Sequence, residues 1–146
     1  MKLSGEALAG SKKMGFDEET VRKVALQVKE LTEDAQIGIV IGGGNFWRGR
    51  SSENIDRTKA DQIGMLATVM NCIYVSEIFR SVGLETEILT PFVCSSFTKL
   101  FSKDKANKYF GQGKVVFRQS LFHICPEILS VPPANLLFHW HAVFPP

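Results

Sequence analysis

Apolar side chains recur every three or four positions in three segments of the chain, and this spacing predicts amphipathic helices. The first helix is expected over 18–33, with Asp17 as its N-cap and acidic residues in its first turn. The second is expected over 58–82, and a short third over 103–110 with Ser102 as its cap. The apolar face predicted for the second helix consists of Ile63, Leu66, Val69, Met70, Ile73, Ile78 and Phe79.

Short apolar runs rich in β-branched residues lie between these helices and predict strands. They are expected over 37–41, 86–90 and 114–117, and residues 1–4 are interpreted as the last residues of a further strand. Strands that alternate with helices indicate a parallel sheet covered by helices on both faces. The predicted fold class is therefore α/β.

The chain changes character after Phe117. Residues 118–146 contain only two charged side chains, Arg118 and Glu127, together with five of the 6 prolines and all 3 histidines. This contrast predicts an α/β unit over 1–117 and a divergent tail over 118–146. Because the change is so abrupt, we expect a reading frame that is shifted or mispredicted after Phe117.

Charge and cysteine content narrow the classes of function. The 17 basic side chains stand against 15 acidic ones, a balance that disfavours nucleic acid or an anionic membrane as a partner. No continuous apolar run reaches the roughly 18 residues that cross a bilayer, and no secretory pattern begins the chain. The odd, widely spaced set Cys72, Cys94 and Cys125 indicates a reduced, cytoplasmic protein rather than a disulfide framework.

Three consecutive glycines, Gly42, Gly43 and Gly44, follow the strand predicted over 37–41. Glycines at the carboxyl end of a buried parallel strand allow a sharp turn and a close approach of backbone amides to an anion. A tight turn without a ligand explains the same residues equally well. The segment matches neither the dinucleotide-binding fingerprint nor the P-loop, so those two cofactor classes are disfavoured.

Three charged residues are candidate binding residues, and one of them, Arg48, lies only four residues after Gly44. Arg48 carries a planar guanidinium that suits phosphate oxygens. Asp61 lies in the first turns of the helix predicted over 58–82 and offers an acceptor for sugar hydroxyls, and Lys2 could neutralise charge during phosphoryl transfer. An ordinary solvated role is the alternative for each of them, and for Asp61 the helix dipole alone favours a carboxylate.

Four possible zinc ligands lie in the tail, namely His123, Cys125, His139 and His141. Their spacing of one intervening residue is not the spacing of common zinc sites, and no second pair completes a family pattern. No metal site is predicted.

Three longer stretches, taken together and in this order, resemble the bacterial uridylate kinases (UMP kinases) of the amino acid kinase superfamily. They are Lys2-Leu3-Ser4-Gly5-Glu6-Ala7-Leu8-Ala9-Gly10, then Ile41-Gly42-Gly43-Gly44-Asn45-Phe46-Trp47-Arg48-Gly49, then residues 56–71, Asp-Arg-Thr-Lys-Ala-Asp-Gln-Ile-Gly-Met-Leu-Ala-Thr-Val-Met-Asn. The resemblance covers about residues 1–117, roughly the first, UMP-binding half of such an enzyme. It implies an amino acid kinase fold and a cytoplasmic transferase that moves the γ-phosphoryl group of ATP to UMP, giving UDP for pyrimidine biosynthesis.

The resemblance also implies roles for single residues. In the family, the positions of Gly43 and Asp61 face UMP. Those at the ATP phosphates are matched here by Lys2, Leu3, Ser4, Gly5, Gly44 and Arg48. A loop linked to activation by GTP is matched by Gly10, Ser11, Lys12, Lys13, Met14 and Gly15. The resemblance further implies Mg²⁺ bound with ATP and a homo-oligomer, a hexamer in the family, for which the helix over 58–82 is a candidate contact element.

The sequence departs from this family after Phe117. The family continues with a glycine-threonine-glycine loop, a proline-aromatic pair and a threonine-aspartate stretch, where this chain has Arg118-Gln119-Ser120-Leu121-Phe122-His123. The adenine-binding half that follows in the family is absent, and so are the residues that precede the lysine of the first strand.

We therefore expect a truncated chain that is weakly active or inactive. The alternative is a non-catalytic, nucleotide-binding or oligomer-interacting fragment of the same fold. Carbamate and acetylglutamate kinases of the same superfamily are disfavoured, because residues 56–71 resemble the uridylate branch.

Overall fold

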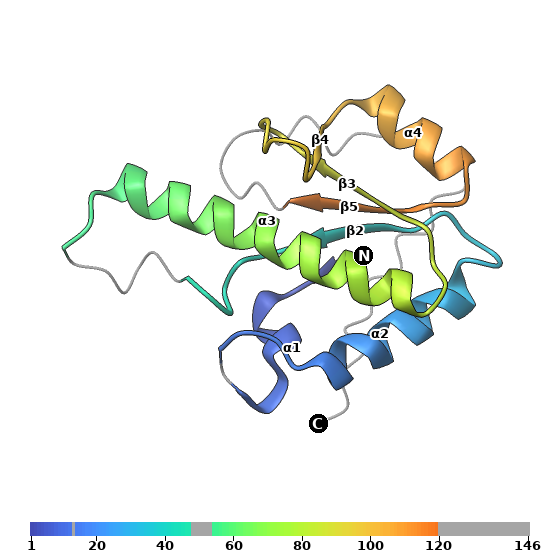
Figure 1. The fold of residues 1–146 in the computed structure, drawn as a ribbon, viewed down its shortest axis with the longest axis horizontal. Coiled ribbons are helices and arrows are strands. Elements are labelled where there is room, and N and C mark those ends of the chain that lie inside the picture. Colours follow the sequence, from blue (N-terminus) through green and yellow to red (C-terminus); the bar gives the residue numbers. More distant parts are fainter. Residues whose placement is uncertain (13, 48–53, 120–146) are drawn as a thin grey trace.

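The computed structural model describes residues 1–12, 14–47 and 54–119. Its centre is a sheet of five strands in the order β1-β2-β5-β3-β4, and every neighbouring pair is parallel (Figure 1). The strands are β1 (Lys2–Leu3), β2 (Gly38–Ile41), β3 (Thr86–Thr90), β4 (Lys99–Leu100) and β5 (Val115–Gln119). The predicted parallel α/β architecture is confirmed.

Helices cover both faces of this sheet. They are α1 (Gly5–Ala9), α2 (Glu18–Leu31), α3 (Arg57–Ser81) and α4 (Lys103–Gly111), with a 3₁₀ helix over Gly10–Lys12. Along β5, Val115 and Phe117 enter the core beneath α2 and α3, whereas Val116 packs with Ala106 of α4. Because successive side chains of a strand point to opposite faces, α4 covers the face opposite to α2 and α3.

Helix α3 packs on the sheet and the glycine triplet mainly with small side chains, together with Phe79 near its C-terminus. The buried residues are Ala60, Ala67, Thr68, Val69, Asn71, Cys72, Val75, Ser76 and Phe79. Of the predicted apolar face, Val69 and Phe79 are buried, but Ile63, Leu66, Met70 and Ile73 are exposed, Leu66 by 56%. The prediction was wrong for these four, because small side chains let the helix approach the sheet and the glycine loop closely.

Helix α3 is also long and apolar enough to cross a membrane, judged by length and composition alone. The sequence predicts no such segment, because no continuous apolar run reaches about 18 residues. In this fold the helix contacts α2, β2, β3 and β5, and 44% of its most apolar window is buried. A helix in the core of an α/β fold meets the same criteria, so this feature is weak evidence for a membrane.

Three short elements are not predicted from the sequence. Helix α1 has five residues and the adjoining 3₁₀ helix three, too few to show a period. Strand β4 has two residues, both exposed, and is defined only by its pairing with β3. Strand β5 extends two residues past its predicted end, to Gln119, because Arg118 and Gln119 continue the parallel pairing with Val40 and Ile41.

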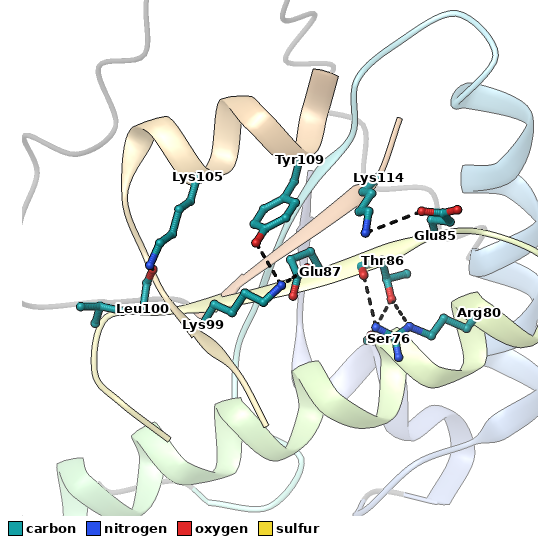
Figure 2. Close-up of polar contacts among 10 residues, drawn as sticks. All are labelled: Ser76, Arg80, Glu85, Thr86, Glu87, Lys99, Leu100, Lys105, Tyr109 and Lys114. Carbon is teal, nitrogen blue, oxygen red and sulfur yellow. Dashed lines mark hydrogen bonds and ion pairs between the residues drawn. The ribbon is translucent and has the colours of Figure 1, made fainter. Parts of the chain in front are cut away.

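Charged and hydroxyl side chains join the β3–β4 edge of the sheet to α3 and α4 (Figure 2). Lys99 forms an ion pair with Glu87 at 2.7 Å and donates to the Tyr109 hydroxyl at 3.0 Å. On the other face, the Ser76 and Thr86 hydroxyls lie 2.8 Å apart, and Arg80 Nε donates to Thr86 Oγ1 at 2.7 Å. The two-residue strand β4 is thereby held by side chains as well as by its ladder.

Candidate functional site

The candidate site lies where β1 and β2 end. These strands are parallel neighbours, with Leu3 opposite Ile41, so Ser4 and Gly5 emerge beside Gly42. The Gly42 amide donates to the Leu3 carbonyl at 3.2 Å, which extends the pairing by one bond. Carboxyl ends of neighbouring parallel strands form the usual ligand edge of such sheets, so two of the sequence-predicted segments are brought together there.

The glycine triplet forms a tight turn. The carbonyl of Gly43 accepts hydrogen bonds from the amides of Phe46 and Trp47, both at 3.1 Å. A Cβ on Gly43 would lie 3.0 Å from the Gly64 carbonyl oxygen and 3.0 Å from Thr68 Oγ1, so this glycine packs directly on α3. Gly43 is therefore required for packing, in addition to any role in approaching a ligand.

Gly5 meets the same loop from the other side. A Cβ on Gly5 would lie 2.5 Å from Asn45 Oδ1 and 2.8 Å from both the Gly42 oxygen and the Gly44 nitrogen. Two of these three atoms belong to the backbone and cannot rotate away. Helix α1 and the glycine triplet can lie this close to each other only because residue 5 has no side chain.

Two buried asparagines bind the segments of the site together. Asn71 Nδ2, on α3, donates to Asn45 Oδ1 at 2.6 Å and to the Gly42 carbonyl at 2.7 Å. Asn45 Nδ2 donates to Asn71 Oδ1 at 3.2 Å and to the Gly15 carbonyl at 2.8 Å. Both residues lie in motifs that resemble the uridylate kinases, but neither is among the predicted site residues. The sequence carries one sign of this pair: Asn71 is a polar residue at a position of α3 whose helical neighbours, Ala67 and Val75, are apolar.

The loop over 10–15 also has specific backbone requirements. Gly10 and Gly15 have φ values of 54° and 77°, a conformation that favours glycine. The Gly15 amide donates to the Asn45 carbonyl at 3.2 Å, so Gly15 is tied to the glycine loop twice. The predicted effector segment thus lies against the candidate nucleotide site, and Lys13 is outside the described residues.

Of the remaining predicted residues, Asp61 and Lys2 are exposed and Ser4 caps a helix. Asp61 is exposed in the second turn of α3, whose N-terminus is capped by Asp56 through the amides of Thr58 and Lys59. Lys2 is exposed on β1, and Ser4 caps α1 by accepting from the Ala7 amide at 3.4 Å. Arg48 lies outside the described residues, as do the four possible zinc ligands of the tail.

Two buried polar atoms at this end of the sheet have no hydrogen-bond partner within the described part of the chain, Trp47 Nε1 and Gln119 Oε1. Gln119 is 1% exposed at the end of β5, and its Nε2 donates to the Met65 carbonyl of α3 at 3.2 Å. Its neighbour Arg118 points to the opposite face and lies 4.6 Å from the centre of the Phe101 ring. Neither Gln119 nor Trp47 was among the predicted site residues.

The described groups at this site suit the binding and positioning of a ligand. Burial raises the pKa of the Cys72 thiol, next to Asn71, to about 12, so this thiol is neutral at ordinary pH and is no nucleophile. No group of three or more His, Cys, Asp and Glu side chains that could hold a metal occurs among residues 1–12, 14–47 and 54–119. Backbone amides and glycines at a strand edge instead suit an anionic ligand.

Comparison with known proteins defines the class. The model of the amino acid kinase family matches residues 1–128, and the chain therefore belongs to this family. It is 42% identical over 117 residues to the uridylate kinase of Fervidobacterium nodosum, a match that covers 80% of this chain and 50% of that protein.

Solved structures agree with this result. The UMP kinase of Ureaplasma parvum matches with a TM-score of 0.75 and 26% identity, over 80% of this chain and 52% of that one. The UMP kinase of Bacillus anthracis matches with a TM-score of 0.75 and 29% identity, over 80% of this chain and 50% of that one. The predicted resemblance is confirmed, and the chain spans about half the length of these relatives.

Proposed function

We propose that this chain forms the UMP-facing half of a UMP kinase, which transfers the γ-phosphoryl group of ATP to UMP in the cytoplasm. The observation that carries this proposal is the packing of the glycine triplet between Gly5 and α3, at the carboxyl ends of β1 and β2. The similarity to uridylate kinases over 117 residues supplies the nucleotide class.

We assign residues to the two nucleotides as the resemblance to the uridylate kinases implies. Gly43, against α3, and Asp61, on the same helix, are proposed to face UMP. The ATP phosphates are proposed to contact Lys2, Leu3, Ser4, Gly5, Gly44 and Arg48. The loop over 10–15 is proposed to respond to GTP, as the resemblance implies, and Gly15 at its end is hydrogen-bonded to Asn45.

The reaction requires no covalent enzyme intermediate. A phosphate oxygen of UMP attacks the γ-phosphorus in line, the bond from that phosphorus to the β,γ-bridging oxygen breaks, and ADP leaves. Backbone amides and Lys2 would bind the phosphate oxygens and hold the two nucleotides in line. The family implies Mg²⁺ with ATP, but the described residues offer no cluster of ligands for it, and we assign it none.

The nucleotide assignment is tested by titrating the full chain with UMP, CMP and AMP by calorimetry. We expect UMP to bind best and Asp61→Asn to weaken its binding by about tenfold, because the neutral amide accepts more weakly than the carboxylate and carries donors in place of one acceptor oxygen. Asp104→Asn is the matched control, because Asp104 is also an exposed aspartate near a helix N-terminus. Equal binding of the three nucleotides, or equal effects of the two variants, would contradict the assignment.

Phosphoryl transfer is tested separately, by following UDP formation from UMP and Mg·ATP in a coupled assay with the same chain. UDP formation that falls in parallel with UMP affinity in Asp61→Asn supports the kinase. UMP binding without UDP formation supports the alternative, a nucleotide-binding fragment of the fold.

We also propose that α3 contacts a second copy of the chain. Ile63, Leu66, Met70 and Ile73, the α3 stripe, are exposed at helical spacing on one face. In an antiparallel pair of α3 helices centred near residue 68, Ile63 lies opposite Ile73 and Leu66 opposite Met70. Lys59 then faces Glu77, so apolar and charged positions match in a two-fold contact. Sedimentation of the unmodified chain should show dimers or larger assemblies, and Leu66→Glu should dissociate them. A monomeric unmodified chain, or assemblies that persist in Leu66→Glu, would contradict this contact.

A further inference from the structure

The amide groups of Asn45 and Asn71 form a complete hydrogen-bond network in the interior. Each Nδ2 has two N–H donors, and all four have acceptors: the two side-chain oxygens and the carbonyls of Gly15 and Gly42. Asn71 is 0% exposed and Asn45 is 2% exposed, so water does not compete for these bonds. A buried polar network with every member satisfied holds its segments in one arrangement.

The network joins segments that are far apart in the sequence. Gly15 ends the loop over 10–15, Gly42 begins the glycine triplet, and Asn71 lies in the middle of α3. Gly5, at the start of α1, closes the arrangement, since a Cβ there would lie 2.5 Å from Asn45 Oδ1. Because no donor is spare, the loop over 10–15 cannot move away from the glycine triplet without leaving a buried amide unpaired.

We propose that the Asn45–Asn71 pair is a positioning element that sets the glycine triplet for nucleotide binding and couples it to the loop over 10–15. The identity of the nucleotide rests on the proposed function. A ligand at the glycine triplet then reduces opening of the loop at Gly15. By reciprocity, whatever holds that loop closed raises nucleotide affinity.

The test is amide hydrogen exchange at Gly15, measured with and without saturating UMP. In the unmodified chain, UMP is expected to slow this exchange. Asn71→Ser replaces the amide with a shorter hydroxyl, so the bond to the Gly42 carbonyl is lost or lengthened and the Asn45 amide is left partly unpaired. It should speed Gly15 exchange about tenfold without UMP, abolish the protection by UMP, and raise the Kd for UMP about tenfold, as for a lost hydrogen bond.

The matched control is Ser76→Ala. Ser76 lies on α3 five residues after Asn71, and the substitution removes its buried hydrogen bond to Thr86 of β3. It should leave both Gly15 exchange and UMP affinity unchanged once global stability is taken into account. Equal effects of the two variants, or unchanged exchange at Gly15 in Asn71→Ser, would overturn the proposal. If Asn71→Ser does not fold, Asn45→Ser serves with the same expectations at Gly15.

Failure of the proposed function gives a different result. If the unmodified chain binds neither UMP nor Mg·ATP, the nucleotide assignment fails. The change of Gly15 exchange in the nucleotide-free variants still decides whether Asn71 holds the loop.

Discussion

The two edges of the sheet use polar groups in different ways. At the β1–β2 edge, neutral amides and backbone atoms are buried and glycines allow contact distances that no side chain permits. At the β3–β4 edge, the Lys99–Glu87 ion pair is formed by a lysine whose side chain is 50% exposed. Buried neutral networks fix relative positions, whereas exposed ion pairs contribute little to stability. The edge that positions the proposed ligand site is therefore the one with glycines and asparagines.

The largest effect is expected from Gly5→Ala, which places a methyl group within 2.8 Å of two backbone atoms of the glycine triplet. Overpacking of this kind should lower the free energy of unfolding by about 3 kcal/mol. Gly111→Ala is the control, since a Cβ there meets nothing within 4 Å and should be neutral or slightly stabilising. Urea unfolding of both variants measures the difference in their stability. Equal midpoints would mean that the close packing at Gly5 does not limit stability.

A smaller effect is expected at alkaline pH, in the core next to the asparagine pair. Burial raises the pKa of Cys72 from 9.0 to about 12, so its stabilising contribution is complete below pH 9 and is lost as the pH rises towards 12. The linkage slope of about 1.4 kcal/mol per pH unit predicts a loss of roughly 2 kcal/mol by pH 10.5. Cys72→Ala should be less stable at pH 7 but should lose less between pH 9 and 10.5. If the unmodified chain and Cys72→Ala lose the same stability between pH 9 and 10.5, the raised pKa of Cys72 is contradicted.

Ser76→Ala tests a buried hydrogen bond at the β3 side of α3. The serine is 2% exposed and its hydroxyl lies 2.8 Å from that of Thr86, which retains Arg80 as a donor. Because Thr86 keeps this partner, a loss of only about 1 kcal/mol is expected in thermal or urea unfolding. A loss as large as that in Gly5→Ala would mean that stability depends equally on buried contacts at both edges.

The smallest effect is expected from Lys99→Ala at the β3–β4 edge. The Lys99 side chain is 50% exposed although that of Glu87 is only 14% exposed, so water and salt reach the ammonium and about 0.5 kcal/mol should be lost, and less at high salt. Lys99→Met retains most of the aliphatic stem and separates the charge from packing. A loss above 2 kcal/mol at low salt would show that this edge also depends on polar contacts.

The sequence by itself determined the class of fold and the family. The periods of α2 and α3, the apolar runs of β2, β3 and β5, and three motifs in order were sufficient, because these signals are local. The glycine triplet was also recognised from its position after a strand. The alternation of strands and helices then implied the parallel sheet.

Only the tertiary structure decided which face of α3 is buried and what binds the site together. Ile63, Leu66, Met70 and Ile73 of α3 are exposed, and where this helix meets the glycine triplet it presents the small residues Gly64, Ala67 and Thr68. Asn45 and Asn71 are 26 residues apart, and their pairing depends on how α3 lies against the end of β2. Local periodicity carries no information on such long-range contacts, so the asparagine network and the buried Gln119 required the folded structure.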